Sequence, residues 1–508
     1  MLRIFGPPGT GKTTALLNMV DDALSSGVAP NEIAFLAYTR KAANEAKERA
    51  AARFGLDPKK DLVYFRTIHS LALALSTIRA DQIIQPEHYA EIGHFCGVSL
   101  GDTSTPDFEE DLPTVTASKD PILGLINLAR LRKVSLREQY NISSLDIEWN
   151  IVAYVDRAIT AYKKRFGLYD FTDMLDVFIH ESSTFCPRFQ LTFVDEAQDL
   201  SPLQWDIAHI LDAHSNRMYA AGDDDQAIYR WAGADVDHFI NLPGGSETLS
   251  QSYRVPRTVH RVAEAVAKRI HRRFPKRYEP RPADGSVSRI YGIPDLLRQG
   301  LLDTGTWLIL AQSGYMLAPV ANDLKSSGYL FNYRGHRSIS ERISTAVNGW
   351  EQMRKGRSIT IDVAKTIYSL MSMDRIKRGF KKLPGLVDSD MVNLDTLIAD
   401  HGLLATKDMI WSEAMDRIPQ ADRAYITALL RRGEKFNAVP RITISTIHGS
   451  KGGEADNVVL FTDLSNAALQ ETMTNPDDMH RVFYVGVTRT KTNLYIVEAE
   501  DRTRGYDL

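Results

Sequence analysis

Residues 6–13 have the residue types and the spacing of a loop that binds polyphosphate. The segment Gly6-Pro7-Pro8-Gly9-Thr10-Gly11-Lys12-Thr13 fits the pattern G-x-x-x-x-G-K-[ST] at every position. The glycines let backbone N–H groups turn inward around phosphates, at a helix N-terminus whose dipole favours anions. The Lys12 ammonium would contact the β- and γ-phosphates, and the Thr13 hydroxyl would ligate Mg²⁺. The sequence therefore predicts a nucleoside-triphosphate site formed by Gly6, Pro7, Pro8, Gly9, Thr10, Gly11, Lys12, Thr13 and Thr14.

Two carboxylates after an apolar stretch supply the other half of such a site. Residues 191–194 are continuously apolar, which is typical of a buried strand, and they lead directly into Asp195 and Glu196. In a chain with a phosphate loop, Asp195 would hold Mg²⁺ together with Thr13, and Glu196 would orient and deprotonate the attacking water. An acidic surface turn is the alternative, and the buried strand before the carboxylates argues against it.

Short apolar stretches are placed so that one parallel sheet would carry these motifs. Strands are predicted at residues 2–5, 33–37, 63–65, 191–194 and 218–221, and a helix at residues 14–24. Open α/β sheets bind ligands where their strands end at helix N-termini. Tyr38 and Arg40 follow one such strand, where they would stack on a base and hold a phosphate. An aromatic residue at a strand end more often packs in the core, so this signal is weak alone.

The composition is that of an ordinary globular protein, and it excludes several classes. With 508 residues, 44% hydrophobic and 25% charged, the chain should fold into several subdomains. The formal charge of −3 means that any basic surface for nucleic acid must be local. Two cysteines, Cys96 and Cys186, exclude a disulfide scaffold and fit a reducing cytosol. No apolar run is long enough to span a membrane, and the phosphate loop stands where a signal peptide would need its apolar region. A cytoplasmic protein without a membrane partner is expected.

A series of segments in fixed order resembles one family of nucleic-acid motors. Residues 195–199 and 222–234 resemble the UvrD/Rep/PcrA branch of superfamily-one helicases. The resemblance continues at residues 38–43, 67–70, 170–175, 249–254, 446–454 and 484–490. Tyr38 and Ile68 stand where Phe is usual, and Gly453 stands where Leu is usual. The family normally has a Gln motif before the phosphate loop, and none of the five residues before Gly6 is Gln.

The resemblance implies an α/β fold of two RecA-like parallel-sheet domains, each with a mostly helical insertion, and ATP in the cleft between them. The first domain is expected at residues 1–80 and 166–250, with its insertion at residues 81–165. The second domain is expected at residues 251–342 and 440–508, with its insertion at residues 343–439. Strands at residues 307–311, 442–445, 458–461 and 494–497 would build the second sheet.

The same resemblance implies roles for individual residues. The catalytic residues of the first domain would be Lys12, Thr13, Asp195, Glu196 and Gln226. Arg254 and Arg489 of the second domain would act as arginine fingers toward the γ-phosphate, stabilising charge in the transition state. Tyr253 is expected to stack on adenine, and Glu454 to contact the ribose side of the nucleotide. The residues expected along the single-stranded DNA are Tyr38, Arg40, His69, Trp231 and His448.

The expected function is that of an ATP- and Mg²⁺-dependent DNA helicase in a bacterial cell or a phage-infected host. Its partners would be single-stranded and tailed duplex DNA, on which it would move 3′→5′ with DNA-stimulated hydrolysis; no protein partner is indicated. The runner-up is a translocase that displaces proteins and unwinds little. A P-loop small-molecule kinase would leave Gln226, Arg254 and Arg489 unexplained. A nucleotide-gated DNA-binding module would require a lost catalytic residue, and none is missing.

One basic run remains open to two interpretations. Residues 268–277 are rich in Lys and Arg, and they would either follow DNA phosphates or form a solvated helix surface. The insertion expected in the second domain contains another basic cluster, at residues 375–382.

Overall fold

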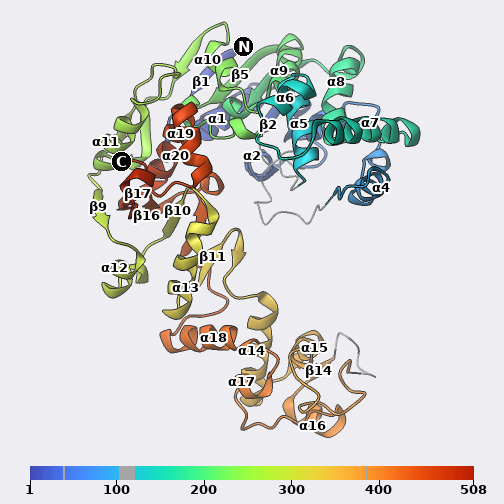
Figure 1. Cartoon of the computed structure of the whole chain (residues 1–508), viewed down its shortest axis with the longest axis vertical. Coiled ribbons are helices and arrows are strands. Elements are labelled where there is room, and N and C mark those ends of the chain that lie inside the picture. Colours follow the sequence, from blue (N-terminus) through green and yellow to red (C-terminus); the bar gives the residue numbers. More distant parts are fainter. Residues whose placement is uncertain (38–39, 102–119, 384–386, 388–389) are drawn as a thin grey trace. The chain divides into compact units, whose positions relative to one another are not determined.

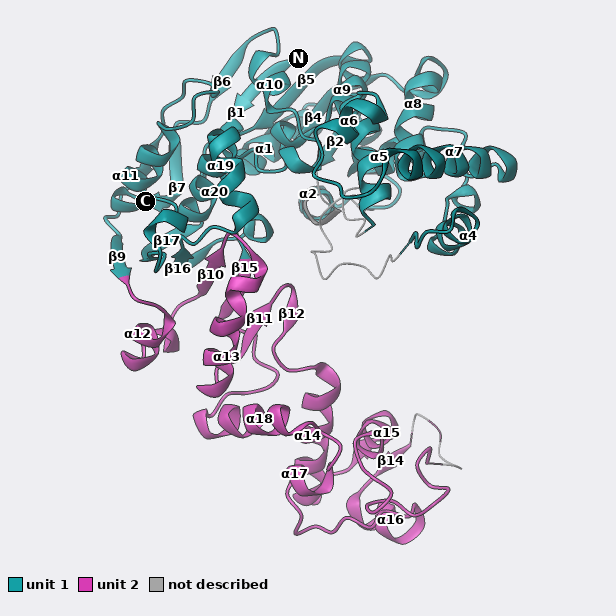
Figure 2. Cartoon of the chain, viewed as in Figure 1, with its two compact units in different colours: residues 1–289, 446–508 teal, residues 290–445 magenta. Residues whose placement is uncertain are grey.

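The computed structural model describes the chain except for residues 38–39, 102–119, 384–386 and 388–389. The chain forms two compact units, one of residues 1–289 and 446–508 and one of residues 290–445 (Figure 2). The division of each RecA-like domain into segments, as expected from the sequence, stays a prediction. None of the described helices combines the length and the apolar character needed to cross a membrane.

A six-stranded parallel sheet forms the centre of the first unit (Figure 1). Its strand order is β3-β2-β4-β5-β1-β6, and every neighbouring pair is parallel. The strands are β1 Leu2–Phe5, β2 Ile33–Ala37, β3 Phe65–Thr67, β4 Phe189–Val194, β5 Ser215–Gly222 and β6 Ser246–Thr248. Because the carboxyl ends of parallel strands share one edge, the segments after β1, β4 and β5 meet there. The five strands predicted here are confirmed, but β3 lies two residues later than predicted, and β4 and β5 are longer than predicted.

Helices cover both faces of this sheet and bury it. They are α1 Lys12–Ser25, α2 Arg40–Phe54, α3 Ile68–Ala74, α8 Phe171–Phe185, α9 Pro202–Ala213 and α10 Val236–Asn241. The alternation of β2 shows how both faces are filled. Phe35 packs into one core with Leu16 and Val20 of α1, whereas Leu36 packs into the other with Leu71 of α3.

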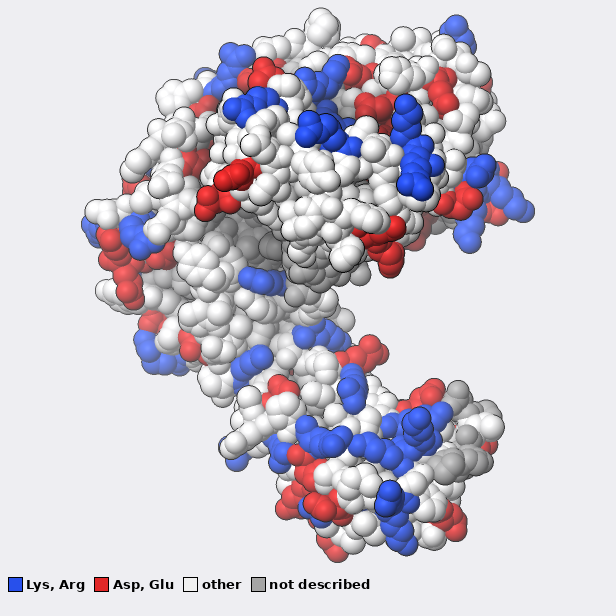
Figure 3. Space-filling model, turned by 45° about the vertical axis from the view of Figure 1, so that its right-hand side comes forward, with Lys and Arg blue, Asp and Glu red and all other residues white. Residues whose placement is uncertain are grey.

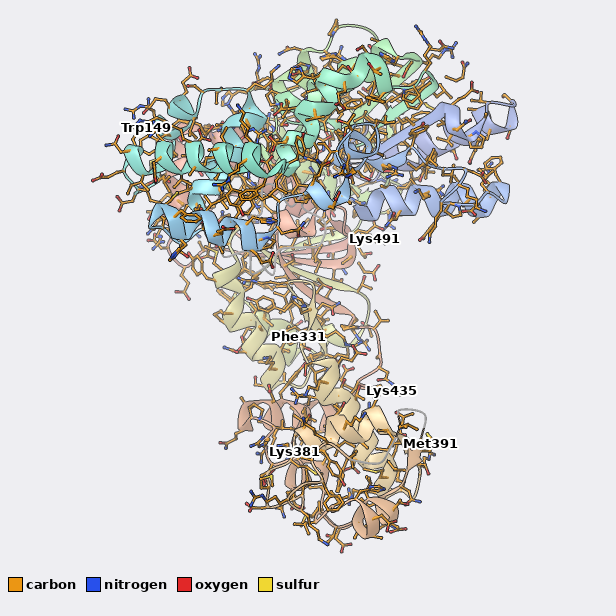
Figure 4. All side chains as sticks on the ribbon, turned by 90° about the vertical axis from the view of Figure 1, so that its right-hand side faces the viewer. Trp149, Phe331, Lys381, Met391, Lys435 and Lys491 are labelled. Atoms are coloured by element: carbon orange, nitrogen blue, oxygen red, sulfur yellow. The ribbon has the colours of Figure 1, made fainter. Side chains whose placement is uncertain are left out.

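A helical subdomain stands between β3 and β4, as expected from the sequence. Its helices are α4 Pro86–Cys96, α5 Pro121–Arg132, α6 Leu136–Asn141 and α7 Trp149–Phe166. They enclose a separate apolar core that includes Ile92, Ile126 and Val155. Trp149, labelled in Figure 4, begins the longest of them.

The rest of the first unit contains the elements that carry the later motifs. They are β7 Gln251–Pro256, α11 Arg257–Ala267, β8 Glu279–Arg281, β9 Ser286–Ile290, β16 Ala455–Phe461, α19 Asn466–Thr474, α20 Pro476–Thr488 and β17 Thr490–Val497. Strand β16 pairs in parallel with β17, and β7 pairs in parallel with β8. Helix α20 is almost entirely buried, so its polar residues lie inside the protein.

The second unit combines short strands with helices. Its strands β10 Trp307–Ala311, β11 Phe331–Tyr333, β12 His336–Arg337 and β15 Ile442–Thr446 follow the order β12-β11-β15-β10. Strands β13 Ile359–Thr360 and β14 Met391–Val392 form a separate pair. The helices are α12 Ile293–Arg298, α13 Ala318–Ser326, α14 Glu341–Arg354, α15 Ile361–Ser369, α16 Leu394–Asp400, α17 Trp411–Ala414 and α18 Gln420–Arg432.

Basic side chains are exposed on this second unit (Figure 3). In the run at residues 375–382, Lys377, Arg378 and Lys382 are exposed. The mixed α/β fold with parallel sheets that the sequence predicted is confirmed.

Candidate active site

The phosphate loop joins β1 to α1 and is held by short hydrogen bonds. Gly9 and Gly11 have φ angles of 73° and 75°, a left-handed conformation that glycine adopts without strain. The Thr10 hydroxyl donates to the Pro7 carbonyl at 2.8 Å, and the Gly6 N–H donates to the Gly222 carbonyl of β5 at 2.9 Å. The loop is thereby fixed against the neighbouring strand of the sheet. Thr14, in the first turn of α1, is exposed.

The two predicted halves of the nucleotide site come together at the edge of the sheet. The Lys12 ammonium lies 2.7 Å from Asp195 Oδ1 and also pairs with Glu196. The Thr13 hydroxyl donates to Asp195 Oδ2 at 2.6 Å. Thr13 and Asp195 therefore present adjacent oxygen atoms, which is the ligand type that Mg²⁺ prefers.

Glu196 combines an unusual backbone conformation with a depressed pKa. Its φ of 56° is left-handed, a conformation that is uncommon for residues other than glycine, and its side chain pairs with Lys12. Burial alone would raise the carboxyl pKa, but the ammonium groups of Lys12 and Lys451 outweigh burial and lower it to about 2. The same carboxylates raise the pKa of Lys12 above its ordinary value, against the effect of burial. Both groups are charged at neutral pH.

Lys451 is a further cation in the site, and the sequence analysis did not single it out. Its Nζ pairs with Asp199, lies 3.9 Å from Glu196 Oε2 and donates to the Gln226 carbonyl at 3.0 Å. Gln198 is also part of this group, because its amide donates to Glu196 Oε2 at 2.6 Å. Lys451 falls within the segment 446–454 that resembles the helicase family, so the motif itself was the available signal.

Gln226 and Arg489 are joined by a direct hydrogen bond. The Arg489 Nη2 donates to Gln226 Oε1 at 2.7 Å, and the Gln226 amide donates to Asp223 Oδ2 at 2.7 Å. Arg489 is only 2% exposed. Burial, and then the nearby Arg254 guanidinium, lower the pKa of Arg489 to about 9, so the side chain remains charged at neutral pH.

The strand β7 brings Arg254 and Tyr253 against the phosphate loop. The Tyr253 N–H donates to the Gly9 carbonyl at 2.8 Å, and the Ser252 hydroxyl donates to the Pro8 carbonyl at 2.7 Å. Gly9 is required here because a side chain would collide with Arg254 Cβ. The Tyr253 side chain is 71% exposed beside the loop, which suits it to stack on a ligand.

Glu454 has cations on two sides. It accepts a hydrogen bond from Arg254 Nε at 2.6 Å and pairs with Lys491 at 2.6 Å. Lys491, labelled in Figure 4, lies at the start of β17. These two ion pairs lower the pKa of Glu454 against the effect of burial. Glu454 thus links a predicted arginine finger to a second strand.

The basic run at residues 268–277 fits neither of its two interpretations at two positions, because Arg273 and Lys276 pair with carboxylates of the protein itself. Lys276 is buried against Asp223, Asp224 and Asp225, and Arg273 pairs with Asp225. Buried carboxylates are stabilised by cations inside the fold, so these two side chains neutralise aspartates in the protein interior.

Two aromatic residues follow β5 next to the nucleotide site, and one of them is exposed. Trp231 is 49% exposed and its ring lies 6.3 Å from the ring of His448. Tyr229 is buried, as expected of a core residue, and its ring lies 4.8 Å from the Lys451 ammonium. Burial and then Lys451 lower the pKa of His448 to about 4. The histidine is therefore neutral at physiological pH.

His69 lies in a cavity of about 480 Å³ in the first unit. Its Nε2 atom is buried and, among the described residues, has no hydrogen-bond partner. Burial lowers its pKa to about 4. Other residues that line the cavity are Asn44, Lys47, Lys59, Arg66, Ser70 and Phe171. Tyr38 lies outside the described residues, and so does the side chain of Arg40.

Comparison with known proteins identifies the family of the chain. A family model described as the UvrD/REP helicase N-terminal domain matches residues 1–244, and one described as the UvrD-like helicase C-terminal domain matches residues 420–501. Together the two matches cover well over half of the chain, and they include every residue named above as part of the nucleotide site except Ser252, Tyr253 and Arg254.

Individual relatives have the same character. An ATP-dependent DNA helicase PcrA of Leuconostoc citreum is 29% identical over 291 residues, which are 54% of this chain and 38% of the relative. That of Bacillus subtilis (strain 168) is 27% identical over 295 residues, 54% of this chain and 38% of the relative. The matched region thus spans less than two fifths of these relatives. The order of motifs, the geometry of the site and both family models agree that the chain belongs to the UvrD/REP helicase family.

Proposed function

We propose that this chain is an ATP-dependent DNA motor that moves 3′→5′ along single-stranded DNA and unwinds tailed duplexes. The observation that carries the proposal is that one short segment, residues 226–231, reaches both predicted sites. Gln226 at its start bonds Arg489 in the nucleotide site, and Trp231 at its end is exposed beside His448. A segment in contact with both ligands would give hydrolysis a direct route to the nucleic acid.

The charges of the site favour a polyphosphate. Burial, and then the Arg254 guanidinium, lower the pKa of Arg489, so the charged form of this buried side chain is disfavoured. An anion between two such guanidinium groups would relieve their repulsion. Lys12 would reach the same phosphates, and Thr13 and Asp195 would hold Mg²⁺, which would neutralise phosphate charge as hydrolysis proceeds.

Glu196 is the proposed base. While Lys12 pairs with it, a pKa of about 2 makes it a weak proton acceptor. Moving the Lys12 ammonium onto phosphates would remove one of the charges that depress this pKa, so nucleotide binding would itself strengthen the base. Water would then attack the γ-phosphorus while the bond to the bridging oxygen of ADP breaks, and Glu196 would take the proton released by the water.

The proposed contacts with DNA are base stacking and hydrogen bonds from neutral imidazoles. Trp231 offers an exposed ring on which a base can stack, and stacking is tolerant of sequence. His448 and His69 are neutral at physiological pH, so they would contact DNA through hydrogen bonds rather than as fixed cations. The cavity beside His69 has Lys47, Lys59 and Arg66 to attract phosphates.

Two assays test the proposal. ATP hydrolysis is measured with and without a single-stranded oligonucleotide, with Glu196→Gln as the inactive control. Strand separation is measured on duplexes that differ only in carrying a 3′ or a 5′ single-stranded tail. We expect strong stimulation by the oligonucleotide and unwinding only from the 3′ tail.

The outcomes separate the competing functions. Hydrolysis that does not respond to single strands would contradict a motor and favour small-molecule phosphoryl transfer. Unwinding from the 5′ tail alone would contradict the direction. Displacement of streptavidin from biotinylated single strands without duplex unwinding would favour the translocase.

A further inference from the structure

A buried cluster of ion pairs lies next to Gln226 of the nucleotide site. The Lys276 ammonium is within 3.1 Å of Asp223 Oδ1, 2.6 Å of Asp224 Oδ1 and 2.8 Å of Asp225 Oδ2, and its side chain is 1% exposed. A lysine has three N–H donors, so one ammonium serves three carboxylates at once. The carboxylates are those of the turn that begins at the end of β5.

The three carboxylates differ in what else holds them. Asp225 also pairs with Arg273 at 2.5 Å, and Asp224 accepts the backbone N–H of Phe274 at 2.7 Å. Asp223 accepts the backbone N–H of Asp225 at 3.2 Å and the Gln226 amide at 2.7 Å, and among the described residues its ion pair is with Lys276. Lys276 therefore supplies the positive charge beside the Asp223 carboxylate.

Asp223 in turn fixes the orientation of Gln226. A carboxylate only accepts hydrogen bonds, so the Gln226 NH₂ group must face Asp223, at 2.7 Å. A guanidinium only donates, so the carbonyl oxygen of the same amide must face Arg489, at 2.7 Å. If the amide were reversed, its oxygen would face the Asp223 carboxylate and its NH₂ group would face the N–H groups of Arg489. The chain of contacts runs from Lys276 through Asp223 and Gln226 to Arg489.

We propose that Lys276 is a positioning residue for the Gln226–Arg489 pair. The inference rests on the proposed function, in which Arg489 contacts the phosphates of the nucleotide. Lys276 holds Asp223 charged and in place, and Asp223 presents the Gln226 oxygen to Arg489. A purely structural ion pair would change stability alone, whereas a positioning residue changes turnover in the same way as loss of Gln226.

The sharpest variant is Asp223→Asn, which keeps Lys276 and the size of the side chain. The oxygen of the new amide must accept from Lys276, so its NH₂ group faces the Gln226 NH₂ group. Gln226 then satisfies either residue 223 or Arg489, but not both. Asp224→Asn is the matched control. It removes one charge from the same cluster and leaves the contacts of Asp223 with Lys276 and Gln226 in place.

Lys276 is tested directly in the double variant Lys276→Met/Asp224→Asn, which removes one positive and one negative charge and so avoids an extra unpaired carboxylate. Turnover with saturating single-stranded DNA, KM for ATP, DNA affinity and Tm are measured for all variants and for Gln226→Ala. We expect Asp223→Asn and the double variant to lose about tenfold to a hundredfold in kcat, with the other three quantities close to those of Asp224→Asn. Adding Gln226→Ala to Asp223→Asn should cause no further loss.

Each result decides the question. Equal kcat for Asp223→Asn and Asp224→Asn in an active wild-type background overturns the role of Lys276 and leaves the proposed function standing. If the loss of kcat in the double variant Asp223→Asn/Gln226→Ala equals the product of the two single losses, the proposal is also overturned. Residues that act through one another should show a smaller combined loss than that product. If the double variant Lys276→Met/Asp224→Asn fails to fold, Asp223→Asn still tests the step through which Lys276 acts, and an unchanged kcat in that variant overturns the proposal. Wild-type protein without DNA-stimulated hydrolysis overturns the proposed function and, with it, this inference.

Discussion

The Nζ atom of Lys12 lies 2.7 Å from Oδ1 of Asp195, while Oδ2 of the same carboxylate accepts the Thr13 hydroxyl at 2.6 Å. One carboxylate thus joins the cation expected to bind phosphates to the hydroxyl expected to bind Mg²⁺. The Lys12 ammonium cannot keep its ion pair with Asp195 and also form its full set of contacts with a triphosphate. We therefore expect Lys12 to change partners when nucleotide binds.

Lys12→Ala and Glu196→Gln should both abolish hydrolysis but differ in nucleotide binding. Loss of Lys12 removes a charge-assisted phosphate contact worth about 1.5–3 kcal/mol, so the affinity for ATP should fall. Glu196→Gln removes only the proton acceptor, so ATP should stay bound and unhydrolysed. Binding of a fluorescent ATP analogue and single-turnover hydrolysis measure the two effects.

Lys268→Ala is the control for the first of these variants. Lys268 is an exposed lysine that pairs with Glu264 at 3.4 Å. It should leave binding and hydrolysis unchanged. Turnover by Glu196→Gln within about tenfold of wild type would show that another group takes the proton.

Protonation of His69 should weaken the fold as the solution becomes acidic. Burial lowers its pKa from 6.5 to about 4, so between these pH values the unfolded chain binds more protons than the folded one. The free energy of unfolding must therefore decrease as the pH falls through this window. In His69→Asn that part of the decrease should disappear, as measured by urea unfolding at pH 7.5, 6 and 5.

The exposed His94 provides the matched control. His94→Asn should keep the wild-type dependence of stability on pH. An unchanged pH dependence in His69→Asn would mean that the imidazole is hydrated in solution and titrates normally.

Trp231→Ala should weaken single-stranded DNA binding far more than it slows hydrolysis without DNA. Stacking of a base on an aromatic ring contributes about 1–3 kcal/mol and has little sequence preference. Fluorescence anisotropy with oligonucleotides of different sequence measures the loss. Tyr291, which is 99% exposed, has no part in the candidate site, and Tyr291→Ala should bind as wild type does. Equal loss of DNA binding and DNA-free hydrolysis in Trp231→Ala would identify Trp231 as a structural residue.

The sequence predicted the elements that carry the chemistry because their signals are local. The buried strands at residues 33–37 and 307–311 have the same ends in the structure, since continuous apolar runs bounded by polar residues define them. The meeting of Lys12 with Asp195 also followed, because parallel strands bring their carboxyl ends to one edge.

Contacts between segments far apart in the chain could not be predicted from the sequence. Lys276 looked like part of a surface run, yet it is buried because three aspartates of a turn about fifty residues earlier need a cation. The position of Lys451 is likewise set by its ion pairs with Glu196 and Asp199, which follow strand β4. Which of several lysines fills such a position depends on tertiary packing, and charge patterning alone does not reveal it.

Tyr253 provides a test of how the nucleotide base is bound. Its side chain is 71% exposed, while its backbone N–H is tied to the Gly9 carbonyl at 2.8 Å. A ring held beside the phosphate loop is placed to stack on the base of a bound nucleotide. Tyr253→Ala should therefore raise KM by a factor corresponding to about 1–3 kcal/mol. Its kcat should change little, because stacking is equally strong in the ground state and the transition state.

Stacking also predicts the selectivity of the site. Because every base has a π-face, Tyr253→Ala should lower kcat/KM for ATP, GTP and CTP by similar factors, and the wild type should prefer ATP only modestly. Tyr253→Phe keeps the ring and should behave as wild type. The measurement is kcat/KM for each nucleotide with saturating single-stranded DNA. A preference for ATP above roughly a hundredfold, about 2.7 kcal/mol, would instead require hydrogen bonds to the adenine edge, because a buried polar group left unpaired rejects the wrong base strongly.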